Sequence, residues 1–85
     1  MLDEKLLNIY KIYPFCSISI TDKSNVHMVI IDVELYFRGK HLPIRNNVTF
    51  TLKEINNDEN LQNYLVEKTL EQIRYFIDHT LKNEV

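Results

Sequence analysis

Cysteine, glycine and proline are scarce in this sequence, and each scarcity excludes a class of protein. Cys16 is the single cysteine, so no intramolecular disulfide can form and a disulfide-stapled secreted domain is excluded. Gly39 is the single glycine, which leaves no glycine-rich loop to cradle a phosphate group. Only two prolines interrupt the chain, so long regular elements are expected.

Long apolar runs and a strong net charge are also missing. No window reaches the roughly 18 consecutive apolar residues of a membrane-spanning helix, and the opening MLDEKLL carries acids where a signal peptide carries bases. The formal net charge of -2 provides no strong field for nucleic acid or for an anionic membrane surface. We therefore expect a cytoplasmic protein without membrane contact.

The composition that remains is that of an ordinary folded domain. Hydrophobic residues make up 45% and charged residues 26% of the 85 positions, which is enough to bury one modest core. We expect a single domain over residues 1–85. The complete absence of alanine beside many isoleucines and asparagines is the bias of an AT-rich coding sequence, which is compatible with a mobile element.

The stretch 26–37 (VHMVIIDVELYF) predicts the central strand of a sheet. Its odd positions from Val29 to Phe37 are all apolar, whereas its even positions mix apolar and charged residues. Alternation of this kind indicates a strand with a buried odd face. Residues 15–21 also alternate and predict a preceding strand, with a turn over residues 22–25.

The next segment, residues 42–53, predicts a hairpin partner for the central strand. Antiparallel neighbours share a face, so we expect Phe37 to pair with Leu42 and Glu34 with Arg45 around a four-residue loop, Arg38 to His41. Asn46 then falls at an inward position, either as a satisfied buried amide or at a bulge.

Helices are predicted at both ends of the chain. Leu2, Leu6, Tyr10 and Tyr13 recur at helical spacing and predict a helix over residues 2–12. A second helix is expected from about Asp58 to Lys82, with one apolar arc facing the sheet. The predicted fold class is therefore α+β, a short N-terminal helix, a three-stranded antiparallel meander and a long C-terminal helix packed on one sheet face.

Residues that could carry catalysis or bind a metal are sparse. The three histidines have no metal-ligand spacing, and Cys16 falls on the apolar face of a predicted strand. Asp32 and Glu34 point outward together, as glycosidase carboxylates sometimes do, but a solvated or partner-binding surface is the better interpretation. We predict no enzyme activity, no cofactor and no metal site.

Two surfaces could bind a protein partner. The outward positions Met28, Ile30 and Tyr36 form an apolar patch on the outer sheet face, which either the N-terminal helix, a second copy or a partner would cover. Tyr64, Lys68 and Tyr75 form a stripe on the long helix opposite its apolar arc, although surface tyrosines are also common. We hypothesise a noncatalytic protein-protein interaction module, an inhibitor or adaptor from a phage or other mobile element, that self-associates as a homodimer or higher oligomer.

The hairpin tip supports an alternative function. Arg38, Lys40, His41 and Arg45 form a small basic cluster that could contact nucleic acid weakly, although a solvated turn is the simpler interpretation.

The order helix, three strands, helix resembles that of double-stranded RNA-binding domains, over most of the chain and in topology only. That family opens its second helix with a cluster of lysines that bind phosphates, where this chain has Asn57-Asp58-Glu59-Asn60. The family's alanine-rich helix and Gly-Pro loop are absent as well. The resemblance therefore extends to the element order and not to the function. The same order is similar to that of some small phage inhibitors such as anti-CRISPR proteins.

Overall fold

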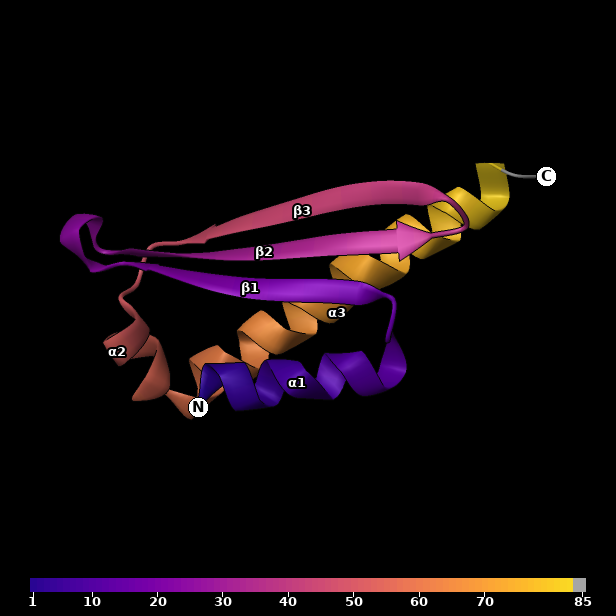
Figure 1. Cartoon of the computed structure of the whole chain (residues 1–85). Coiled ribbons are helices and arrows are strands. Elements are labelled where there is room, and N and C mark those ends of the chain that lie inside the picture. Colours follow the sequence, from indigo (N-terminus) through magenta and orange to yellow (C-terminus); the bar gives the residue numbers. More distant parts are fainter. Residues whose placement is uncertain (84–85) are drawn as a thin grey trace.

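The fold is an α+β layer pair, as the sequence predicts. The computed structural model describes residues 1–83, with side chains through residue 79 (Figure 1). A three-stranded antiparallel sheet in the order β1-β2-β3 is packed against helices. The elements are α1 (Leu2–Ile12), β1 (Cys16–Lys23), the 3-10 turn η1 (Ser24–Val26), β2 (Met28–Phe37), β3 (Lys40–Val48), α2 (Leu52–Asn56) and α3 (Glu59–Asn83).

α1 and α3 pack on the same face of the sheet, because residues of both helices join one core cluster with β2. In Figure 1, α1 lies below the strands, and α3 starts beside α1 and crosses the strands diagonally. The odd residues of β2 from Val29 to Leu35 are buried there, as predicted, in one cluster with residues of α1 and α3, whereas Phe37 at the strand end is half-buried. The fully buried members of this cluster are Leu2, Ile9, Val29, Ile31, Val33, Leu35, Ile55 and Ile73. The alternative in which α1 covers the outer sheet face is therefore wrong.

The connection between β1 and β2 differs from the prediction. β1 extends to Lys23, and the chain reverses through η1 and His27, whose φ of 55° lies in the left-handed region. β2 consequently begins at Met28 rather than at Val26, and Val26 lies exposed in the turn instead of on the sheet.

The β2-β3 hairpin has a tighter turn than predicted. Only Arg38 and Gly39 form the loop, with φ values of 52° and 75°, and Phe37 pairs with Lys40. Positive φ at both positions is what a two-residue type I′ turn requires. The observed register differs from the predicted one by two residues, which preserves every face because side chains alternate with a period of two.

The new register changes the cross-strand partners on both faces. Arg45 lies opposite Asp32 rather than Glu34, and Glu34 lies opposite Pro43. Asn46 lies opposite Ile31 and is buried, so the satisfied-amide alternative is confirmed, since its side chain exchanges hydrogen bonds with a glutamine of α3. The pairing runs through this position without a bulge.

The segment after β3 is helical, not extended as predicted. β3 ends at Val48, and Thr51 caps the short helix α2. The Thr51 hydroxyl accepts a hydrogen bond from the Glu54 N–H, while the Glu54 carboxylate accepts from the Thr51 N–H. This capping box forms because threonine and glutamate stand three residues apart at the helix start, and Phe50 is left exposed before it.

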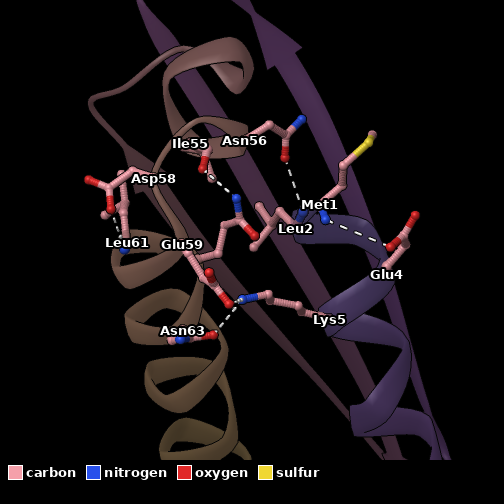
Figure 2. A network of polar contacts seen from close by, with 11 residues as sticks. Met1, Leu2, Glu4, Lys5, Ile55, Asn56, Asp58, Glu59, Leu61 and Asn63 are labelled. Atoms are coloured by element: carbon pink, nitrogen blue, oxygen red, sulfur yellow. Dashed lines mark hydrogen bonds and ion pairs between the residues drawn. The ribbon is translucent and has the colours of Figure 1, made fainter.

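Polar contacts at the helix ends join the three helices (Figure 2). The Asn56 side chain accepts a hydrogen bond from the Leu2 N–H at 3.0 Å and so satisfies a free donor at the start of α1. Asp58 caps α3 by accepting from the Leu61 N–H at 3.1 Å.

Two long side chains complete this junction. Gln62 is buried and donates to the Ile55 carbonyl at 2.9 Å, while Lys5 of α1 contacts Asn63 at 2.7 Å and Glu59 at 3.6 Å. The start of α1 is therefore held on both α2 and α3, which leaves the opposite side of the sheet uncovered among residues 1–83.

Candidate interaction surface

The outer face of the sheet is formed by alternate residues of all three strands, and no described helix packs on it. It is mostly polar at its centre, with hydroxyls on β1, carboxylates on β2 and basic groups on β3. The outward positions in the observed register are Ser17, Ser19, Thr21, Lys23, Met28, Ile30, Asp32, Glu34, Tyr36, His41, Pro43, Arg45 and Asn47.

The apolar patch predicted on this face is smaller than expected. Ile30 is only 8% exposed, because it lies on the central strand between Thr21 and Asn47 of the neighbouring strands. Met28 is half-buried, whereas Tyr36 is 55% exposed. Of the three predicted contact residues, Tyr36 therefore offers the most surface.

Tyr36 is held in a cluster with Glu34 and His41. Its ring stacks on the His41 ring with the centroids 4.6 Å apart and the planes 4° from parallel. Its hydroxyl donates to the Glu34 carboxylate at 3.2 Å, and the charge of Glu34 raises the pKa of that hydroxyl. His41 Nε2 lies 3.6 Å from the same carboxylate. The aromatic ring is consequently fixed in orientation although it is exposed.

A second polar pair lies beside this cluster. Arg45 Nε donates to Asp32 Oδ1 at 2.8 Å, and this hydrogen bond with the Asp32 carboxylate raises the Arg45 pKa. Between the pair and Glu34 the surface is hollowed into a depression of about 440 Å³, which Ser17 and Ser19 also line. The depression thus presents hydroxyls, carboxylates and one guanidinium in fixed positions.

The basic residues of the hairpin tip do not act as one cationic cluster. Arg45 and His41 each face a carboxylate of β2, and Arg38 lies over the Phe37 ring at 5.5 Å. Lys40 is exposed at the first position of β3. Because His41 and Arg45 lie beside acidic partners, the field available to a phosphate backbone is reduced.

The predicted stripe on α3 is exposed along its length. Tyr64 is 60% and Tyr75 58% exposed, and Lys68 between them is also exposed. The Tyr75 ring stacks on the His79 ring with the centroids 3.8 Å apart, and the Tyr75 carbonyl oxygen lies 2.8 Å from His79 Nδ1. The predicted apolar arc lies on the opposite side of the helix, where Leu65, Thr69, Leu70 and Ile73 are buried and Val66, Phe76 and Ile77 are half-buried. Its further members Thr80 and Leu81 lie outside the described side chains.

Sequence reasoning missed a groove on the helix side of the sheet. This groove, of about 380 Å³, runs between α1, the edge of β1 and α2. The Tyr10 hydroxyl lies in it and accepts from the Ile18 N–H at 2.7 Å, with the Ile18 carbonyl 3.3 Å away. The signal in the sequence is Leu7, an apolar residue off the buried side of α1 that is 58% exposed.

Catalytic and metal chemistry find little support in the described residues. Cys16 is buried, and burial raises the pKa of its thiol, which disfavours the reactive thiolate. Among residues 1–83 no group of three or more histidine, cysteine, aspartate or glutamate side chains is arranged to hold a metal ion. No described helix combines the length and apolar character needed to cross a membrane.

Comparison of the chain with protein-family models, curated proteins and solved structures found no match.

Proposed function

We propose that this chain is a noncatalytic protein-binding module whose partner docks on the outer face of the sheet. The observation that carries this proposal is the position of the helices. α1 and α3 both pack on the inner face. The exposed Tyr36 and the hydrogen-bonded pair Asp32 and Arg45 are therefore left on the outer face, which nothing in residues 1–83 covers.

The chemistry of this face favours a protein partner. Tyrosine and arginine are enriched among the residues that dominate binding energy at interfaces. Arg45 lines the depression, and Tyr36 is hydrogen-bonded to Glu34, which also lines it. Tyr36 is oriented by His41 and Glu34, and Arg45 by Asp32. Side chains that are fixed before binding lose less conformational entropy on association.

The shape of the depression also suits a protein partner better than a buried small molecule. Its lining is mixed polar and apolar and comes from three strands of a single sheet, whereas small-molecule sites are mainly apolar. A role as an inhibitor or adaptor follows from this reasoning, because binding without a catalytic group can act only by occupying or joining other proteins.

The chain offers a matched control for testing this site. Tyr36 and Tyr64 are the same residue type with nearly the same exposure, 55% and 60%, on opposite layers of the fold. Tyr36→Ser and Tyr64→Ser each remove a mostly exposed ring. Tyr36→Ser also removes the contacts with His41 and Glu34, so thermal melting of both variants checks that each still folds.

The experiment is affinity capture from the native host, followed by measurement of the affinity for the captured protein. We expect Tyr36→Ser to raise the Kd by about thirtyfold, as for loss of a central interface tyrosine, and Tyr64→Ser to leave it unchanged. The reverse pattern would transfer the site to the α3 stripe with Tyr64, Lys68 and Tyr75. If both variants bind the partner with the wild-type Kd, both sites are contradicted.

Weak nucleic-acid binding by the hairpin tip stays a hypothesis with less support. It concerns the hairpin-tip residues Arg38, Lys40, His41 and Arg45, of which His41 and Arg45 lie beside carboxylates. A salt-dependent gel shift that is lost on changing Arg38 and Lys40 to glutamate would support it. No shift at low salt would remove it.

A further inference from the structure

The outward side of α1 carries a charge pattern that is complementary to itself. Asp3, Leu7 and Lys11 follow at intervals of four residues, so they lie along one side of the helix, and all three are exposed. Among the side chains described, those of Asp3 and Lys11 have no hydrogen-bond or ion-pair partner. An acid, an apolar residue and a base thus stand in line, evenly spaced, with the apolar residue at the centre.

From this pattern we infer that a second copy of this chain docks on α1, with the two helices antiparallel about a two-fold axis at Leu7. In that arrangement Asp3 of each copy faces Lys11 of the other, which forms two equivalent ion pairs about 12 Å apart along the helix, at about 1.5 Å per residue. A parallel arrangement would place like charges opposite one another at both positions. The charge order therefore selects the antiparallel dimer.

The apolar surface at the centre is continuous with the groove between α1 and β1. Asp3, Leu7 and Tyr10 line this groove together with Ile18, Ile20 and Leu52. Leu7 of the second copy would enter the groove at the axis, so an exposed apolar side chain is removed from water in both copies. A closed two-fold contact of this kind buries the same patch on each chain.

Docking between helices is favoured over strand pairing at the β1 edge. An exposed edge strand can pair with a second copy through its free backbone groups, and β1 lies at the edge of the sheet. The Tyr10 hydroxyl, however, occupies both the N–H and the carbonyl of Ile18. The backbone groups at the middle of the β1 edge are therefore already hydrogen-bonded, whereas the outward side of α1 is exposed.

Charge reversal tests this dimer directly, with sedimentation equilibrium from micromolar to millimolar protein. We expect the wild-type chain to dimerise, and Asp3→Lys or Lys11→Asp to raise the dimer Kd by about tenfold or more, since each change replaces two attractive pairs by two repulsive ones. An equimolar mixture of the two single variants should associate again, because the lysine introduced at position 3 of one variant then faces the aspartate introduced at position 11 of the other. The two unchanged side chains, Lys11 of the first variant and Asp3 of the second, face each other as well, so both ion pairs are restored. The double variant should also self-associate.

The mixture distinguishes loss of the ion pairs between Asp3 and Lys11 from other causes of weaker dimerisation. A loss of helix stability from Asp3→Lys would persist in the mixture, whereas a lost ion pair is restored there, and circular dichroism of each variant checks the fold. A wild-type chain that stays monomeric at millimolar concentration would overturn the inference. So would single variants that dimerise like the wild type, or a mixture that does not associate. None of these outcomes depends on the outer sheet face, so the proposed function is tested separately.

Discussion

The amide pair between Asn46 and Gln72 joins β3 to α3 and offers the sharpest test of the packing. Asn46 Nδ2 donates to Gln72 Oε1 at 2.7 Å, and Gln72 Nε2 donates to Asn46 Oδ1 at 3.0 Å. Asn46 is buried and Gln72 half-buried. Each amide therefore supplies both hydrogen bonds that the other needs on the inner face.

Replacing one member leaves the other without its partners. Asn46→Val suits a strand position but removes both hydrogen bonds from the Gln72 amide, which costs about 1–2 kcal/mol because Gln72 retains some access to water. Replacing both members, as Asn46→Val with Gln72→Met, should cost about 0.5 kcal/mol or less, since apolar groups of similar shape need no partner.

Urea denaturation followed by far-ultraviolet circular dichroism measures these differences. With a denaturant slope of about 1–2 kcal/mol/M, Asn46→Val should lower the midpoint by about 1 M and the double variant should recover most of it. Asn47→Val is the matched control, since Asn47 is the next residue on the same strand and is exposed on the outer face. Its stability should stay within about 0.5 kcal/mol of the wild type. The reasoning is refuted if Asn46→Val is as stable as the control, or if the double variant is no more stable than Asn46→Val alone.

Three further predictions concern the edge of the sheet, the hairpin and the capping box. Tyr10→Phe leaves the Ile18 backbone groups without the hydroxyl and should lower stability by about 1 kcal/mol in the same urea assay; an unchanged midpoint would contradict the edge cap. Gly39→Ala should lower the stability by about 1 kcal/mol, because φ at this position is +75°. The cost is conformational and not steric, since no atom within 4 Å would contact the new methyl group. A neutral effect would argue against the type I′ turn. The Thr51 N–H and hydroxyl lower the pKa of Glu54, so the stability that this carboxylate contributes is complete above the ordinary pKa of glutamate and is lost as pH falls through the lowered value. Thr51→Ala removes the hydroxyl but keeps the N–H, so it should weaken this acid dependence in melts across pH, and an unaltered profile would count against the capping box.

Alternation and helical spacing were sufficient to predict the element order and the buried faces. The odd residues of β2 from Val29 to Leu35 are all buried, because a period of two with apolar side chains on one parity allows one burial pattern. The same periodicity could not distinguish a register shift of two residues, since that shift keeps each face intact. The Arg38-Gly39 turn selected the register instead, through its two positive φ values.

Other differences between the predicted and the observed structure arise from local capping or from tertiary contacts, which hydrophobic periodicity does not encode. The capping box of Thr51 and Glu54 is readable in the sequence but competes there with the alternating pattern of residues 48–53. Which face α1 covers depends on its packing against α3 and on contacts such as that of Asn56 with Leu2, which no local pattern contains. The burial of Ile30 likewise depends on neighbours from two other strands.

The candidate surfaces were only partly predictable for the same reason. The stripe of Tyr64 and Tyr75 lies where helical spacing placed it, because one long helix has a single geometry. The fixed orientation of Tyr36 depends on His41, a cross-strand partner that the predicted register did not place there.

The most direct test of the central claim is a nuclear magnetic resonance titration of the isotope-labelled chain with its captured protein partner. If the outer sheet face is the binding site, the largest shifts will fall on Ser17, Ser19, Asp32, Glu34, Tyr36 and Arg45, while the resonances of Tyr64 and Tyr75 stay in place. Shifts confined to α3 or to α1, with the outer face unchanged, would contradict the account.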